Sequence, residues 1–97
     1  MKKMTDPRLA NVFDALTFSR LMGQYQALPQ HDIQQRWLVL EAAHVLGQTR
    51  FEPHWRVHVA MLRLAWRTAD RKEILGQAMR LALVPVGHVV HRLPLGN

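Results

Sequence analysis

Four polar residues at helical spacing are suited to binding a metal ion. Glu41 and His44 are three residues apart, and His54 and His58 are four residues apart. Residues three or four apart are neighbours on a helix, so each pair would lie on one side of its helix. An antiparallel hairpin would then bring His44 opposite His54 and, one turn of about 5.4 Å deeper, Glu41 opposite His58. The spacing therefore predicts a metal site in one helical hairpin.

The residue types restrict the chemistry of such a site. Three imidazoles and one carboxylate suit zinc, iron(II), copper(II) or nickel, whereas calcium and magnesium prefer oxygen ligands. The chain has no cysteine, which excludes disulfides, a thiolate nucleophile and cysteine-ligated clusters. His88 and His91 form a weaker pair, because their segment is apolar and interrupted by glycine and proline. No catalytic residue or organic cofactor is predicted, since phosphate-loop, dinucleotide and nucleophile-elbow motifs are missing from the sequence.

A purely structural role for the same residues stays open. A histidine near a helix end often hydrogen-bonds a backbone carbonyl or interacts with the helix dipole, and Glu41 could pair with Arg56 or Arg63 across the hairpin. A buried network of Glu41, His44 and His58 that sets the register of the hairpin would produce the same pattern. The metal site and the structural network are therefore equally favoured interpretations.

Local signals place two helices before and around Glu41. Thr5-Asp6-Pro7 is a helix start, and apolar residues at helical spacing extend that helix from about Pro7 to about Ala27. Asp32 and Gln35 form a capping box that opens a second helix. We expect that helix to end at Gly47, because glycine readily adopts the left-handed backbone of a C-cap.

Two further helices follow the same kind of signal. A second capping signal, Thr49-x-x-Glu52, opens a helix that continues through Trp66. This helix is apolar around much of its circumference, so we expect it to be the central element. Asp70-x-x-Glu73 opens a fourth helix, which Pro85 is expected to close. Residues 86–97 are predicted to add one short turn of helix.

These elements predict an all-α fold. We expect residues 1–97 to form a single domain of four main antiparallel helices, arranged as two helical hairpins, with loosely ordered ends at 1–5 and 94–97. The length and the 48% apolar content suit one small core. Both a tetratricopeptide-like array and a four-helix bundle fit helices of this length.

From Leu40 onward the sequence resembles a family of small bacterial proteins. The similarity rests on Leu-Glu-x-Ala-His-x-Leu-Gly-Gln, on His-x-x-x-His-x-x-Met-Leu, on Asp-x-x-Glu-Ile-x-Gly-Gln and on a closing Pro-Leu-Gly-Asn. The family is catalogued as domain of unknown function 3703. The resemblance implies a helical, tetratricopeptide-like fold and assigns no activity.

The charge of the chain points to an acidic partner. Thirteen Lys and Arg residues against seven Asp and Glu residues give a formal net charge of +6. The alternative to metal binding is therefore a tetratricopeptide-like interaction module whose basic face, carrying Arg56, Arg63 and Arg67, binds an acidic peptide or protein. Nucleic-acid binding is disfavoured because no reader motif accompanies the charge. The three tryptophans are expected to pack in the core rather than to stack on bases.

The sequence also predicts a cytoplasmic location. No apolar run approaches the ~20 residues that a membrane-spanning helix needs, and the N-terminus lacks the apolar core of a signal peptide. No membrane contact is expected, and a homodimer is left open.

Overall fold

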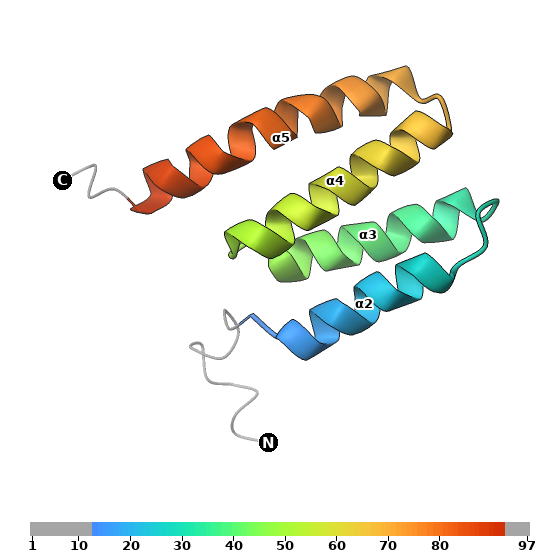
Figure 1. Cartoon of the computed structure of the whole chain (residues 1–97), viewed down its shortest axis with the longest axis horizontal. Helices are drawn as coiled ribbons and strands as arrows, with labels where there is room; N and C mark the ends of the chain where they lie inside the picture. Colours follow the sequence, from blue (N-terminus) through green and yellow to red (C-terminus); the bar gives the residue numbers. More distant parts are fainter. Residues whose placement is uncertain (1–12, 93–97) are drawn as a thin grey trace.

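Four antiparallel helices make up the described part of the chain. A computed structural model describes residues 13–92 (Figure 1). The helices are α2 (Ala15–Ala27), α3 (Ile33–Gly47), α4 (Phe51–Arg67) and α5 (Arg71–Arg92). Between residues 13 and 92 there is no strand, so the all-α prediction is confirmed. The predicted loose ends at 1–5 and 94–97 lie outside the described residues.

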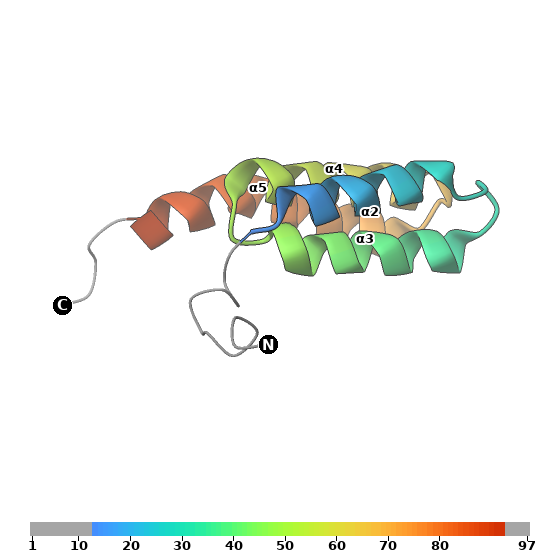
Figure 2. The same ribbon diagram turned by 90° about the horizontal axis from the view of Figure 1, so that it is seen from below.

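The helices pack in chain order. Helix α2 packs on α3, α3 on α4, and α4 on α5, which leaves α2 and α5 at opposite edges (Figure 1). Seen at right angles, α2 and α4 lie on one side and α3 on the other (Figure 2). The molecule is correspondingly flat, with extents of 43 × 37 × 16 Å. The structure is therefore an open array of alternating helices, in which the last helix does not return to the first.

The apolar core is formed by α2, α3 and α4. Leu40 of α3 and Val57 of α4 are completely buried, and each such side chain contributes roughly 1.5–3 kcal/mol relative to the exposed state. The core cluster consists of Phe18, Met22, Tyr25, Leu40, Ala43, Val57, Met61 and Leu64.

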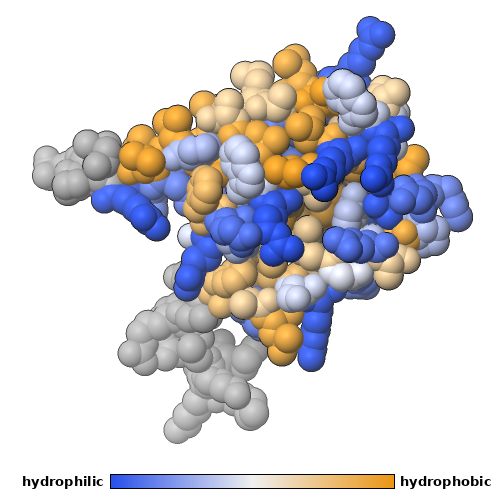
Figure 3. All heavy atoms as spheres, in the orientation of Figure 1, coloured by the Kyte–Doolittle hydropathy of each residue, from blue (hydrophilic) through white to orange (hydrophobic). Residues whose placement is uncertain are grey.

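Helix α5 differs from the other three because it buries little apolar surface. Its buried residues are Gln77 and Val84, and apolar side chains gather along its exposed side (Figure 3). Met79 is 57% exposed on this helix, and Trp66 at the end of α4 is 71% exposed. The prediction that Trp66 packs in the core is therefore wrong. Polar contacts also join α5 to α4, between His88 and His54 and between Gln77 and His58.

Two of the predicted capping interactions are confirmed. The Asp32 carboxylate accepts a hydrogen bond from the Gln35 N–H at 3.3 Å, and the Asp70 carboxylate accepts one from the Glu73 N–H at 3.1 Å. The Thr49 cap is wrong, because Arg50 occupies the N-cap position of α4 without a side-chain hydrogen bond.

The first helix begins later than predicted. The expected start at Pro7 lies outside the described residues, but residues 13 and 14 are not helical. Asp14 caps α2 instead, and its carboxylate accepts hydrogen bonds from the backbone N–H of Thr17 at 3.1 Å and from the Thr17 hydroxyl at 2.6 Å. One continuous helix from Pro7 to Ala27 is therefore ruled out.

Proline 85 lies inside α5 and does not end it. The prediction that the helix closes there, followed by a separate turn, is wrong for the described residues up to Arg92. Proline removes one backbone N–H and therefore one hydrogen bond of the helix. Since α5 packs on α4 alone, water can hydrate the carbonyl left without a donor. The continuation of α5 carries His88 along the side of α4.

Gly47 is required for close packing rather than for a left-handed C-cap. The next residue, Gln48, takes a right-handed helical conformation. A Cβ atom on Gly47 would lie 3.0 Å from the ring of Phe18 and 3.0 Å from the Cβ of Pro53. The glycine therefore lets α2 and the start of α4 approach the end of α3.

Candidate functional site

Helix α4 presents chemically different residues to two cavities. His54, His58 and Met61 line the larger cavity, of about 1010 Å³. Arg56, Arg63 and Arg67 line the smaller one, of about 550 Å³. With 3.6 residues per turn, these two sets fall on opposite sides of the helix. We call the larger space the histidine cavity and the smaller one the arginine groove.

The histidine cavity lies between α3 and α5, with α4 as its floor. Helix α3 contributes Trp37, Glu41 and His44 to one wall, and α5 contributes the opposite wall. The α5 residues used below are Glu73, Gln77, Arg80 and His88, and His91 lines the same wall. Three helices that are consecutive in the chain, with Gln48, Thr49 and Asp70 from the connections between them, therefore supply the polar groups of the cavity.

Three histidines, one from the α3 wall and two from the α4 floor, meet in this cavity. His44, His54 and His58 each offer a ring nitrogen, and these atoms all lie within 4.8 Å of one another. The His54 Nε2 and His58 Nε2 atoms are 3.1 Å apart. His44 packs its ring edge against both others, with centroids 5.0 Å from His54 and 4.9 Å from His58. Within residues 13–92, these three histidines form the one group of at least three potential metal ligands that lie close enough together to hold an ion.

Gln77 determines which nitrogen of His58 carries the proton. Its amide N–H donates to the Glu73 carboxylate at 3.3 Å, so its amide oxygen faces the Nδ1 atom of His58, 2.7 Å away. An amide oxygen only accepts hydrogen bonds, and Nδ1 of His58 must therefore be the donor. In the neutral ring, Nε2 of His58 then keeps a free lone pair directed at His54.

The same reasoning extends to His88. Because Nε2 of His58 is an acceptor, Nε2 of His54 must donate to it. Nδ1 of His54 is then an acceptor for Nε2 of His88, which lies 3.0 Å away. The neutral histidines thus form one directed chain of hydrogen bonds from His88 to Gln77. His44 is outside this chain and touches it through ring contacts.

The surroundings of His44 and His54 disfavour their charged forms. Burial, together with charge repulsion from the neighbouring histidines His58, His44 and His88, lowers the pKa of His54 to about 4. Burial also lowers the pKa of His44, with smaller contributions from His58 and Arg80. Neutral imidazole is the form that binds metal ions. His44 and His54 are therefore uncharged at neutral pH, as metal binding requires.

The structure brings together three of the four residues predicted as metal ligands. Glu41 lies on the wall of the same cavity, is exposed, and is outside the three-histidine group. His58 meets His44 and Gln77 in place of the predicted Glu41. Arg56 pairs with Glu52 on the far side of α4, so the sequence-based pairing of Glu41 with Arg56 is not formed.

Sequence reasoning underestimated His88 and missed Gln77. His88 was assigned to an irregular segment because Pro85 was expected to end the helix. Gln77, His88 and His91 are spaced 11 and 3 residues apart, which places them on one side of a continuous helix. Reading the helix through Pro85 would have grouped them.

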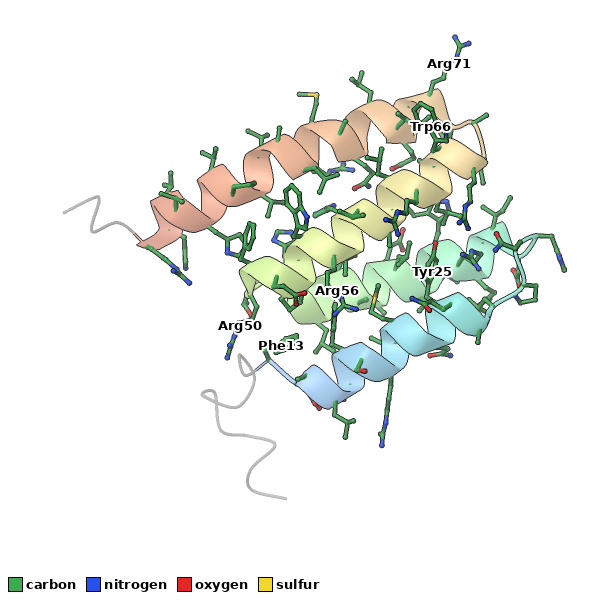
Figure 4. The ribbon with its side chains drawn as sticks, viewed as in Figure 1. Phe13, Tyr25, Arg50, Arg56, Trp66 and Arg71 are labelled. Atoms are coloured by element: carbon green, nitrogen blue, oxygen red, sulfur yellow. The ribbon has the colours of Figure 1, made fainter. Side chains whose placement is uncertain are left out.

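The arginine groove lies between α2 and α4, with α3 beneath. Tyr25 of α2 and Arg56 of α4 lie on its two sides (Figure 4). The three predicted partner-binding residues, Arg56, Arg63 and Arg67, all line it. Arg36 of α3 lines it as well, and sequence reasoning had not singled out this residue.

Residues 14–97 match the model of a protein family described as Protein of unknown function (DUF3703). The chain belongs to this family. The matched range contains every residue that lines the two cavities. Neither the curated proteins nor the solved structures that were compared gave a match. Among the described helices, none is both long and apolar enough to cross a membrane.

Proposed function

We propose that this protein of the DUF3703 family binds a transition-metal ion through His44, His54 and His58. The observation that carries the proposal is the convergence of three ring nitrogens within 4.8 Å at the floor of one cavity. His54 and His58 are separated by one helical turn, the spacing with which helices commonly supply two imidazoles to one metal. The metal would serve sensing, buffering or transport.

The spacing of the nitrogens supports this function. Tetrahedral zinc with Zn–N bonds of about 2.0–2.1 Å holds its ligand nitrogens roughly 3.3 Å apart. The Nε2 atoms of His54 and His58 are already 3.1 Å apart. A rotation of the His44 ring within the cavity would complete the set. Little rearrangement is therefore needed on α4, which carries two of the three ligands.

The hydrogen bonds behind the ligands also support it. Metal-bound histidines usually donate their second N–H to a carboxylate, an amide or another acceptor, which fixes the ring. His58 has such a partner in Gln77, at 2.7 Å, and His54 has one in His88, at 3.0 Å. With a metal on Nε2 of His54, the proton of His54 would sit on Nδ1 and would be donated to Nε2 of His88, whose own proton would then be on its Nδ1 atom. The α5 residues thus act as positioning residues for ligands on α4.

Glu41 remains the predicted fourth ligand, with water as its competitor. Three imidazoles with a carboxylate or water suit zinc, iron(II), copper(II) and nickel. The cavity has room for either, and Glu41 is on the wall that carries His44. Glu41→Gln is expected to weaken binding less than loss of any histidine, because water can take the fourth position.

The competing interpretation is that the histidines form only a structural network. His44→Ala separates the two, because it removes a metal ligand and leaves the chain from His88 through His54 to Gln77 intact. Metal binding requires that this variant lose zinc affinity, by more than about 100-fold. A purely structural network requires that His44→Ala change neither metal content nor affinity. His31→Ala, which removes an exposed histidine elsewhere, is the matched control.

The measurement uses the full chain without a histidine tag. Elemental analysis after purification should give close to one transition metal per chain, and titration of the metal-free protein with zinc, copper, nickel and cobalt should give the affinity. Cobalt in tetrahedral coordination also gives a visible absorption band. A protein that is purified metal-free and binds none of these ions would disprove the proposal.

A further inference from the structure

The arginine groove has a buried cation at its floor. Arg36 is only 4% exposed. Its guanidinium donates to the Leu28 carbonyl at 2.9 Å and to the Tyr25 carbonyl at 3.4 Å, and it lies 4.3 Å above the Tyr25 ring. These contacts hold Arg36 at the end of α2, where the helix dipole is negative. The guanidinium is therefore fixed in place before any partner arrives.

No carboxylate of residues 13–92 forms an ion pair with Arg36. Its Nε–H also has no hydrogen-bond partner within the described residues. Buried charges in proteins are normally paired, and helix carbonyls and an aromatic ring compensate this one only in part. An arriving anion would therefore gain a strong electrostatic interaction at the floor of the groove.

The rim of the groove adds further positive charge. Arg63 and Arg67 are exposed on α4, and Arg67 donates to the Gln30 side chain across the groove at 3.2 Å. Arg56 forms one long contact with Glu52, 3.9 Å, on the surface, which a competing carboxylate can replace. The residues lining the groove include no Asp or Glu. The groove is thus complementary to an acidic ligand.

We propose that the arginine groove binds an extended acidic peptide segment of a partner protein. Arg63 and Arg67 are one helical turn apart, about 6 Å along α4. Alternate residues of an extended chain are about 6.6–6.8 Å apart and point to the same side. Two carboxylates on one side of the peptide therefore match the two rim arginines. The intervening apolar side chains would point to the opposite wall, where Met22 of α2 lines the groove.

The aromatic residues of the groove favour a peptide over a nucleic acid. Single-stranded nucleic acids bind by stacking bases on exposed aromatic rings. The face of Tyr25 is covered by Arg36, and Trp55 is stacked on Phe51 with ring centroids 5.9 Å apart. Because Tyr25 is also only 8% exposed, at most one face of Trp55 is open to a base. This site is independent of the proposed metal function, because it lies on the opposite side of α4.

A fluorescence anisotropy titration tests the proposal. The probe is a labelled, end-capped peptide of alternating glutamate and leucine, and the comparison peptide has glutamine in place of glutamate. Metal-free full-length protein should bind the glutamate peptide at least about tenfold more tightly than the glutamine peptide. The double variant Arg63→Gln, Arg67→Gln should lose about tenfold or more in affinity for the glutamate peptide.

The matched control is the double variant Arg71→Gln, Arg92→Gln. It removes the same charge from α5, where Arg71 projects away from the molecule (Figure 4). Its affinity should stay within about twofold of the unchanged protein, because distant surface charges are screened by salt. His58→Ala, which removes a proposed metal ligand, should also keep peptide affinity. The melting curves of all variants verify that they fold.

Three outcomes would overturn the proposal. In the first, the glutamate peptide binds no more tightly than the glutamine peptide. In the second, both double variants weaken binding of the glutamate peptide equally, which would indicate non-specific attraction. Alternatively, a labelled oligonucleotide binds more tightly than the peptide and loses affinity in the Arg63, Arg67 double variant. That last result would assign the groove to nucleic acid.

Discussion

The two sides of helix α4 have the same architecture and opposite chemistry. In each case two flanking helices form walls and a third forms the floor. The histidine cavity has imidazoles on its floor and its α3 wall, with the carboxylates of Glu41, Asp70 and Glu73 around them. The arginine groove has a buried guanidinium on its floor and arginines on its rim. One helix thus separates a site suited to a cation from a site suited to an anion.

The difference teaches how an open helical array can carry two sites. In a closed bundle the inner face of every helix would be filled by apolar side chains. Among the described helices, α5 packs mainly on α4, and α2 and α5 do not pack extensively on one another, so the gaps between alternate helices stay accessible. The side of α4 that a residue occupies decides which gap it faces. The helical spacing of the histidines and arginines along α4 therefore determines which of them face each site.

The largest expected effect is a loss of zinc affinity without a loss of peptide affinity. His58→Ala removes a ligand and its hydrogen bond to Gln77, and we expect zinc affinity to fall by more than about 100-fold. Peptide affinity at the groove should stay within about twofold, because no groove residue is touched. Calorimetric zinc titration and peptide anisotropy measure both. A loss of both affinities in a folded variant would mean that α4 couples the sites.

The next largest effect tests whether α5 positions a metal ligand in the histidine cavity. Gln77→Ala leaves all three ligands in place but removes the acceptor for Nδ1 of His58. We expect zinc affinity to fall by about 10- to 100-fold, the usual cost of losing the hydrogen-bond partner of a metal ligand. Gln34→Ala, at an exposed position of α3, is the control. Unchanged zinc affinity in Gln77→Ala would show that His58 needs no positioning from α5.

The smallest effect concerns stability and pH. The pKa of His54 is lowered to about 4 from an ordinary value of about 6.5. The unfolded chain therefore binds a proton at a higher pH than the folded chain does, and stability falls as the pH drops from about 6.5 to about 4. We expect the melting temperature of the metal-free protein to decrease by roughly 5 °C across this window.

Replacing the titrating group provides the check on that pH effect. His54→Gln should flatten the dependence between these pH values, whereas Arg63→Gln, on the groove side of α4, should leave it unchanged. An equally steep decrease in His54→Gln would place the responsible group elsewhere. Circular dichroism melts at several pH values, in the presence of a chelator, measure the effect.

Local sequence signals predicted the elements and one half of the site. Asp32 and Asp70 each cap a helix through a carboxylate that reaches three residues ahead, so no distant residue is needed to recognise them. The spacing of His54 and His58 places both on one side of α4 in any helical context. The wrong predictions also came from local sequence signals. Proline 85 usually ends a helix, but its cost of about 3 kcal/mol is overcome here by the contacts that α5 makes beyond it.

The sequence by itself determined that four antiparallel helices form and that His44, His54 and His58 come together in one hairpin. Only the tertiary structure decided that His88 and Gln77 of α5 complete the hydrogen-bonded chain, and that Arg36 lies buried beneath the arginine groove. The physical reason is that capping and helical periodicity depend on residues within about four positions. Contacts between helices depend on how they stack, and here they stack as an open array.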